Sequence, residues 1–344
     1  MENITIKDIA RICGVGVSTV SRAINDYPGI NAETKKKILD TIAEYHYVPN
    51  NSARNLKMLE SDTVALIIKG IDNLFFHGMI KMFEEEFKGS GYTFILQMVS
   101  ENQDEAEIAL ELAKEKRLRG IIFLGGLVNS RYSEEALNSI NIPYVRCTGL
   151  ITNNRDKLKF SSVSIDDEKE SYKVVDYLCK MGHKKIAIIS ERGKTLGAAR
   201  QLGYERALRD NGIEVDQNLI VYMREDLPTY SIENGYAVIK ELMDSEKEFT
   251  ALYAISDLLA FGAYKAIKES GKSIPDDISV VGFDGLSMTD YFTPALTTVE
   301  QPQNEMVKAS IQMLLDAIEG DCEKKEVIYE TRIIEKDSIK RLKE

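Results

Sequence analysis

The sequence predicts a small all-α domain at the N-terminus, joined to a larger α/β core that contains two parallel sheets. Apolar residues recur at helical spacing over residues 5–45. From residue 63 onward, short β-branched runs alternate with helical segments, which is the pattern of parallel sheets covered by helices on both faces. The 344 residues also suffice for two or three packed units, since one domain usually takes roughly 100–200 residues.

The composition is that of a globular protein, with 44% hydrophobic and 29% charged residues. The longest apolar stretches fall far short of the ~20 residues of a membrane span, and the N-terminus lacks the apolar run of a secretory signal. The four cysteines form no C-x-x-C pair, which argues against a disulfide framework or a cysteine zinc site. We therefore expect a cytoplasmic protein that does not span or bind a membrane and that needs no metal or other cofactor.

The charge is distributed unevenly along the chain. Residues 1–60 hold eight basic and seven acidic side chains, a net charge of +1, and the whole chain carries −11, which leaves −12 for the rest. A polyanion would therefore bind only through the N-terminal domain.

Three short helices are expected in the N-terminal domain. Thr5 and Asp8 form a capping-box pattern before the first helix, and Gly14 suits the left-handed turn that ends it. A second helix is expected over residues 17–25 and a third over residues 32–46. The residues of these two helices that should face inward are Val20, Ile24, Ile38, Ile42 and Tyr45.

The first two helices and their tight glycine-containing turn make a helix-turn-helix pattern. On the second helix, Ser18, Thr19 and Ser21 are short hydrogen-bonding groups suited to phosphates or base edges. Arg22 can donate two hydrogen bonds to a guanine. A three-helix bundle with a solvated polar face is the alternative explanation, but the pattern favours DNA binding.

The segments TIKDIARICGVGVSTVSRAIND (5–26) and YVPNNSARNLK (47–57) resemble the headpiece and hinge of the lactose-repressor (LacI-type, LacI/GalR) family of transcription regulators. The resemblance implies a DNA-binding domain at residues 1–47 and a hinge helix with linker at residues 48–61. The base-reading residues that it implies are Val17, Ser18 and Arg22, and the phosphate contacts are Thr5, Thr19, Ser21 and Asn25.

In the hinge, the same resemblance implies DNA contacts from Asn50, Ala53 and Leu56. Leu56 would insert between base steps of the minor groove and bend the duplex, an unstacking cost offset by new contact surface. The alternative is a linker in which Leu56 only packs on the core.

Nine strands are expected in the core, and nine strands over this length suggest two sheets. Their ranges are 64–70, 92–98, 120–126, 143–149, 161–165, 185–190, 219–223, 251–256 and 278–285. In open α/β sheets a ligand binds beyond the carboxyl ends of the strands. Phe75, Phe76, Asp257 and Asp284 follow such ends, and aromatic rings with carboxylates suit a polyhydroxylated ligand. The alternative is that the aspartates cap helices and the phenylalanines are core residues.

Core segments from DNLFF (72–76) to PALTTVEQP (294–302) also resemble the same family, in the same order. The resemblance implies a periplasmic-binding-protein-like core of two Rossmann-like lobes over residues 62–344. The first lobe would hold residues 62–163 and 301–323, and the second would hold 164–300 and 324–344. The implied effector-binding residues are Phe75, Phe76, Arg200, Tyr230, Asp257, Asp284 and Gln301.

Two departures from the family pattern lie in the core. The chain has no tryptophan, so the ring expected to stack on a sugar is the smaller Tyr230. Glu170 and Ser171 replace a pair of glycines, which we interpret as a surface change without functional meaning.

No enzyme is predicted. The segment SERGKTLG (190–197) follows a strand as a Walker A loop would, but Ile188 stands where the first glycine is required. The three histidines have no metal-ligand spacing, and no G-x-S-x-G motif is present.

The sequence therefore predicts a homodimeric, sequence-specific transcription regulator, most simply a repressor, that binds a pseudo-palindromic operator. A small molecule between the lobes would control operator affinity, and a sugar or sugar derivative is the leading class. Purine-like ligands or a protein co-regulator are alternatives for the effector. The alternative function is a cytoplasmic solute-binding or sensing protein without active DNA binding.

Overall fold

The computed structural model describes residues 5–24, 27, 29–45, 62–70, 73–100, 103–126, 137, 142–149, 160–193, 195–245, 247–321 and 323–342. The chain divides into two compact units, residues 1–61 and residues 62–344. Each unit has a hydrophobic core of its own, so the two are described separately.

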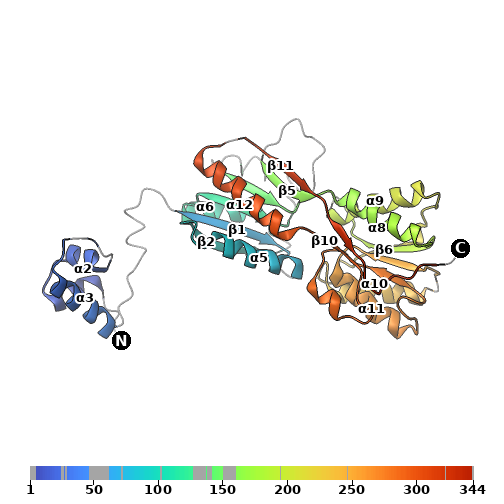
Figure 1. Ribbon diagram of the computed structural model, residues 1–344, viewed down its shortest axis with the longest axis horizontal. Helices are drawn as coiled ribbons and strands as arrows, with labels where there is room; N and C mark the ends of the chain where they lie inside the picture. The colour runs from blue at the N-terminus through green and yellow to red at the C-terminus, as the bar shows by residue number, and fades with distance from the viewer. Residues whose placement is uncertain are drawn as a thin grey trace. The chain divides into compact units, whose positions relative to one another are not determined.

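The N-terminal unit contains three helices within its described residues, α1 (Ile6–Cys13), α2 (Val17–Ile24) and α3 (Ala32–Glu44) (Figure 1). Their core is built around Ile9, Val20 and Ile38, which are all fully buried. The predicted helices and their ends are confirmed to within two residues. The inward orientation predicted for Tyr45 is wrong: its side chain is 46% exposed, because α3 ends at Glu44 and the helical spacing no longer applies.

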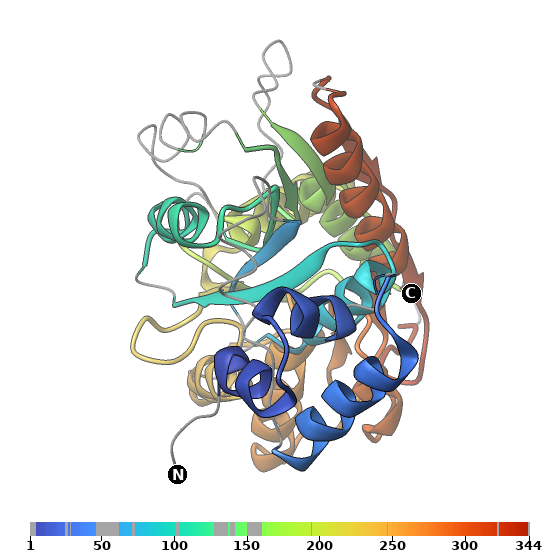
Figure 2. The ribbon, with the colours of Figure 1, turned by 90° about the vertical axis from the view of Figure 1, so that its left-hand side faces the viewer.

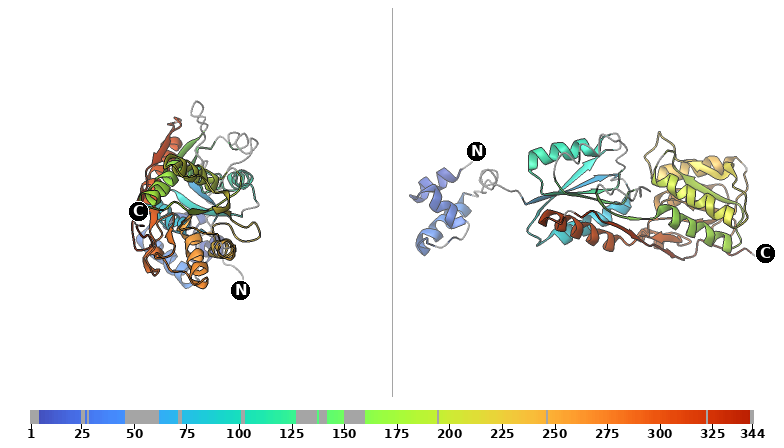
Figure 3. Two further views of the ribbon diagram at one scale, coloured as in Figure 1. Left: turned by 90° about the vertical axis from the view of Figure 1, so that its right-hand side faces the viewer. Right: turned by 90° about the horizontal axis from the view of Figure 1, so that it is seen from above.

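The first lobe of the C-terminal unit contains a six-stranded parallel sheet, with strand order β11-β5-β4-β3-β1-β2. The strands are β1 (Thr63–Lys69), β2 (Thr93–Val99), β3 (Gly120–Leu124), β4 (Tyr144–Cys147), β5 (Ser161–Ile165) and β11 (Glu326–Tyr329). Helix α6 (Glu105–Lys116) covers one face, and α5 (Leu74–Phe87) and α12 (Gln303–Glu319) cover the other (Figures 2 and 3). Because both faces are covered, β1 is apolar and buried from Val64 to Ile68.

The second lobe contains a four-stranded parallel sheet, with strand order β7-β6-β8-β9. The strands are β6 (Ile186–Ser190), β7 (Ile220–Tyr222), β8 (Ala251–Ala254) and β9 (Ser279–Val281). Figure 1 shows α8 (Asp167–Lys180) and α9 (Leu196–Asp210) on one side of this sheet and α10 (Ile232–Asp244) and α11 (Asp257–Glu269) on the other. Two short 3-10 helices complete the lobe, η2 (Gln217–Leu219) and η3 (Ser287–Tyr291).

The chain passes between the lobes three times. It leaves the first lobe after β5, returns between β10 (Thr298–Glu300) and α12, and leaves again between β11 and β12 (Arg332–Ile334). Strands β10 and β12 pair antiparallel beside the second lobe. Single bridges join Thr297 to Val281 at the end of β9 and Glu300 of β10 to Asp284 after β9.

All nine core strands predicted from the sequence are present, but β10, β11 and β12 were not predicted. The lobe boundary predicted at 323/324 is also wrong, because β11 pairs with β5 in the first-lobe sheet. The last passage therefore lies at residues 330–331. A strand of four half-buried residues carries no periodicity that assigns it to either sheet.

Glycines let the helix pairs of the second lobe pack backbone against backbone. A Cβ on Gly262 of α11 would overlap the carbonyl oxygen of Ile232 in α10, and a Cβ on Gly203 of α9 would overlap that of Glu168 in α8. These helix pairs position the residues at the second lobe's edge of the cavity described below.

Replacing Gly262→Ala should destabilise the protein by about 2–3 kcal/mol, because the new methyl group must push two helix backbones apart. The measurement is chemical unfolding of the full chain. Gly78→Ala is the matched control: Gly78 is exposed on α5, and its Cβ would meet only the flexible end of Gln303. The control should be neutral or stabilising by up to about 1 kcal/mol, since alanine favours helix. Equal effects of the two substitutions would contradict the packing argument.

Candidate functional sites

The N-terminal unit presents a polar face on α2. Val17, Ser18 and Arg22 are exposed, with Val17 at 41%, whereas Thr19 and Ser21 are half-buried. The buried side of the same helix carries Val20 and Ala23, so the core fixes which side faces outward. An exposed arginine beside short hydroxyl side chains is a surface suited to base edges and phosphates.

Thr5 has a structural role at the start of α1. Its backbone N–H donates to Oδ2 of Asp8 at 3.0 Å, and its hydroxyl donates to the same atom at 2.6 Å. These hydrogen bonds hold the pKa of Asp8 below its usual value. The hydroxyl of Thr5 keeps its acceptor lone pairs, but its proton is committed to the cap. Four predicted DNA contacts, Asn25, Asn50, Ala53 and Leu56, lie outside the described residues.

A cavity of about 370 Å³ lies between the two lobes of the C-terminal unit. The carboxyl ends of the strands in both sheets supply its walls, as the strand-end rule predicts. Of the seven predicted effector-binding residues, six line it: Phe75, Phe76, Arg200, Tyr230, Asp284 and Gln301.

The first-lobe wall is aromatic. Asn73 caps α5 by accepting a hydrogen bond from the backbone N–H of Phe75 at 3.0 Å, which starts the helix at the cavity. Phe75 and Phe76 then pack edge to face, with ring centroids 5.4 Å apart. Each ring is at least nine-tenths buried, so both also belong to the core.

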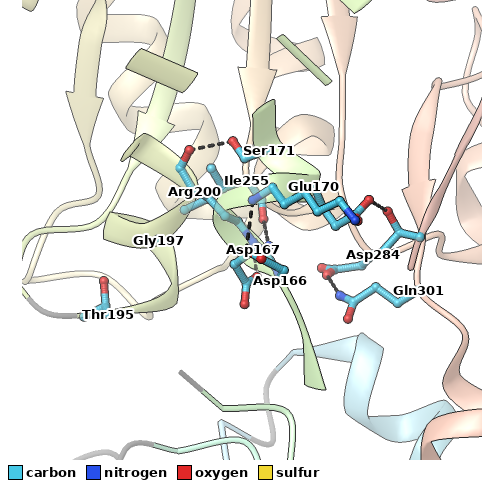
Figure 4. Close-up of polar contacts among 12 residues, drawn as sticks. Asp166, Asp167, Glu170, Ser171, Thr195, Gly197, Arg200, Ile255, Asp284 and Gln301 are labelled. Atoms are coloured by element: carbon cyan, nitrogen blue, oxygen red, sulfur yellow. Dashed lines mark hydrogen bonds and ion pairs between the residues drawn. The ribbon is translucent and has the colours of Figure 1, made fainter. Parts of the chain in front are cut away.

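The second-lobe wall is built around Arg200 (Figure 4). Its Nε donates to Oδ1 of Asp167 at 2.8 Å, Nη1 donates to the carbonyl oxygen of Ile255, and the guanidinium lies 3.7 Å from the ring centroid of Phe283. Arg200 and Asp167 are both less than a tenth exposed. Burial raises the pKa of Asp167, and the Arg200 charge opposes that rise. The pair is therefore a buried ion pair that orients one edge of the guanidinium.

Asp284 is the most unusual carboxylate of the cavity. Its Oδ1 accepts a hydrogen bond from Nε2 of Gln301 at 2.9 Å, whereas its Oδ2 is buried and has no hydrogen-bond partner among the described residues. Burial raises the pKa of Asp284 to about 7, although the charge of Arg200 and the side chains of Gln301 and Ser256 oppose the rise. Its φ of 119° is one that L-residues rarely adopt, and such strain concentrates at functional sites.

Asp257 does not line the cavity, contrary to the placement implied by the family resemblance. It is fully buried at the start of α11, where its carboxylate accepts from Oγ1 of Thr298 at 2.6 Å and from the backbone N–H of Leu286 at 2.8 Å. These hydrogen bonds fix the loop after Asp284 against β10. Asp257 thus acts behind the cavity wall, because its side chain points into the second lobe rather than out of it.

The interpretation of Glu170 and Ser171 as a surface change is wrong, since both are almost fully buried. The hydroxyl of Ser171 donates to the backbone carbonyl of Arg200, and Glu170 accepts from Thr331 at the last passage between the lobes. Ser171 faces α9, where a Cβ on Gly203 would lie 2.9 Å from its own Cβ, whereas Glu170 faces the last passage, so neither position lies on the surface.

Sequence reasoning missed three charged residues of the cavity wall, Lys69, Asp167 and Glu191. Each follows or ends a strand, so the strand-end rule that selected Asp284 would also have found them. Glu191 accepts a hydrogen bond from the hydroxyl of Tyr230 at 2.7 Å. Tyr230 also has a positive φ, 55°, so this bond helps to hold a strained residue in the wall.

The family model for bacterial regulatory proteins of the lacI family matches residues 5–50, and that for a periplasmic binding protein-like domain matches residues 175–339. The HTH-type transcriptional regulator MalR of Clostridium butyricum is 38% identical over 97% of this chain and 98% of its own. A structure of the regulator CelR with cellobiose has a TM-score of 0.72 at 26% identity, covering 97% and 99% of the two chains.

A lac repressor dimer bound to operator and an anti-inducer has a TM-score of 0.79, covering 98% of this chain and 99% of its own, at 22% identity, which shows a shared fold. A helix-turn-helix unit joined to a two-lobed α/β core with a cavity between its lobes defines a class of transcription regulators. This chain belongs to the LacI family of bacterial regulatory proteins, as its N-terminal unit and its core both indicate. Within the residues that the structure describes, no helix is long and apolar enough to cross a membrane.

The raised pKa of Asp284 predicts that the free energy of unfolding depends on pH. Replacing the carboxyl group by an amide should remove this dependence. A carboxyl with a folded pKa of about 7 contributes stability at acidic pH and loses it as the pH rises through 7. Asp284→Asn keeps an acceptor for Gln301 and removes the buried charge. Relative to the natural protein, the ligand-free variant should gain roughly 2 kcal/mol between pH 5 and pH 8.

The measurement is the difference in Tm between the Asp284→Asn variant and the natural chain at several pH values. Subtracting the natural chain removes the titrating groups that do not interact with Asp284, whereas Asp257, whose pKa the charge of Asp284 raises, contributes to the difference. A constant difference from pH 5 to pH 8 would show that Asp284 is ionised throughout and refute the raised pKa.

Proposed function

We propose that this chain is a cytoplasmic repressor whose operator affinity is set by a sugar or sugar derivative bound between its lobes. The observation that carries the proposal is the cavity, whose walls come from both lobes and combine aromatic rings with buried hydrogen-bonding groups. Rings pack on the C–H faces of a sugar, and Asp284, Gln301 and Arg200 supply acceptors and donors for hydroxyls. The cellobiose bound to CelR and the name of MalR support the same ligand class.

The DNA contacts in this proposal come from α2. Val17, Ser18 and Arg22 would read base edges in the major groove, and Thr5, Thr19 and Ser21 would contact phosphates. Asn25 and the hinge residues Asn50, Ala53 and Leu56 complete the proposed DNA contacts. Two copies of the chain would each bind one half-site of a pseudo-palindrome, as a two-fold symmetric dimer requires.

The proposed control works through the angle between the lobes. A ligand that touches both walls favours one angle over the other, and only this difference in affinity can change the operator-binding state. Moving the population from mostly bound to mostly free operator requires about 5 kcal/mol of such difference. Asp284 and Gln301 meet where β10 leads into α12, so a ligand at this pair acts directly on a passage between the lobes.

Arg22→Ala should weaken binding to the specific operator by about fivefold to 150-fold, since a bidentate arginine–guanine contact is worth about 1–3 kcal/mol. The measurement is a gel shift on DNA from upstream of the chain's own gene, beside a scrambled duplex. Lys36→Ala is the matched control, because it removes the same charge from an exposed position of α3. The control should weaken both duplexes alike.

If Arg22→Ala leaves specific binding unchanged, the assignment of α2 as the recognition helix is wrong. If the natural chain binds a sugar but no duplex at low salt, the chain is a solute sensor without active DNA binding.

Asp284→Asn should separate the two activities. The variant should bind the operator like the natural chain, because the substitution lies outside the N-terminal unit, but sugar should no longer release it. The measurement is operator release in a titration with the sugar that gives the largest thermal shift in a carbohydrate screen. Loss of operator binding together with the sugar response would instead assign Asp284 a purely structural role.

A further inference from the structure

The charged groups at the cavity are mostly acidic. Among the described lining residues, Lys69 and Arg200 are basic, whereas Asp167, Glu191 and Asp284 are acidic. A further carboxylate, Glu105, lies directly behind the first-lobe wall, where a Cβ on Gly126 would overlap it.

Both basic side chains already have acceptors within the protein. Arg200 is committed to Asp167 and to the carbonyl oxygen of Ile255. Nζ of Lys69 donates to the carbonyl oxygen of Gln103 at 2.8 Å and lies 4.0 Å from Oε2 of Glu105. Glu105 is 3% exposed and neither of its carboxylate oxygens has a hydrogen-bond partner among the described residues, and the charges of Arg146 and Lys69 oppose the effect of burial on its pKa.

Two acceptors remain on the second-lobe wall. Oδ2 of Asp284 is buried without a hydrogen-bond partner within the described structure, and Glu191 is half-buried with the hydroxyl of Tyr230 as its donor. A buried acceptor without a donor is costly, and a ligand O–H that donates to it removes that cost. The wall therefore favours a ligand that brings hydrogen-bond donors.

From this arrangement we propose that the effector is an uncharged sugar, that the cavity rejects phosphorylated and acidic sugars, and that Glu191 is a specificity-determining residue for this rejection. The inference rests on the proposed function, since it narrows the class of sugar that the same cavity binds. Hydroxyl groups of a neutral sugar can donate to Asp284 and Glu191. A phosphate or carboxylate brings only further acceptors and a negative charge to a wall that is rich in acidic groups and whose two basic side chains already have acceptors within the protein.

The electrostatic penalty should be measurable. Two like charges about 6 Å apart at the edge of a protein repel enough to weaken binding by roughly tenfold to a hundredfold. Such rejection by like charge is how a binding site excludes a close analogue of its ligand.

The test is calorimetric titration of the full chain with matched sugars. The neutral probes are glucose, ribose, maltose and cellobiose, and the anionic probes are glucose 6-phosphate, ribose 5-phosphate and glucuronate. We expect at least one neutral sugar to bind and every anionic probe to bind at least about tenfold more weakly than that sugar. An anionic probe that binds as tightly as any neutral sugar would overturn the inference but leave the proposed function standing. If no probe of either kind binds, the proposed sugar response fails, and the inference fails with it.

Glu191→Gln tests the assigned residue. Glutamine still accepts the hydrogen bond from Tyr230, so the wall keeps its shape while one negative charge is lost. The ratio of neutral to anionic affinity should fall by about tenfold in this variant. Glu214→Gln is the control, since Glu214 is exposed in the second lobe and does not line the cavity, and it should leave the ratio unchanged. An unchanged ratio in Glu191→Gln would show that Glu191 does not determine the specificity.

Discussion

The buried ion pair between Arg200 and Asp167 is the interaction on which the second-lobe wall depends. One guanidinium joins α9 to the start of α8, to the end of β8 through the Ile255 carbonyl, and to the ring of Phe283. Removing either member of such a pair would leave an uncompensated buried charge, which costs several kcal/mol. The same positive charge also limits how far burial raises the pKa of Asp284. The guanidinium of Arg200 therefore holds this wall together and is already oriented before a ligand binds.

A second constraint is the number of passages between the lobes. Because the chain crosses three times, the lobes can change their relative angle without separating, and a ligand that binds both walls shifts that angle. The hydrogen bond between Gln301 and Asp284 lies at one passage, and that between Thr331 and Glu170 lies at another. Residues that line the cavity thus also form a hydrogen bond at a passage between the lobes. A ligand that contacts them can therefore act directly on the angle between the lobes.

The uneven charge of the chain suits the division of tasks. The acidic core repels a polyanion, so the nearly neutral N-terminal unit is the part of the chain suited to contact DNA. The same excess of carboxylates reaches into the cavity, where it favours ligands that donate hydrogen bonds. The excess of acidic residues in the core therefore bears both on where DNA can bind and on which small molecules the cavity favours.

Much of the fold was predictable from the sequence, because local periodicity decides it. Helical spacing and caps determined the three helices of the N-terminal unit, and β-branched runs determined nine strands of the core. The rule that ligands bind at strand ends selected Asp284, and family resemblance added Arg200 and Gln301. Each of these signals depends on residues that are close together in the chain or on a short sequence motif.

Only the tertiary structure decided which strand-end carboxylate faces the cavity. Asp257 and Asp284 have similar local sequence settings, but Thr298, distant in the chain, draws Asp257 into the lobe. Glu170 is buried and accepts a hydrogen bond from Thr331 at the last passage between the lobes, and pairing with β5 assigned β11 to the first lobe. These outcomes depend on which segments meet in space, and a pattern read along one segment carries no information about its partner.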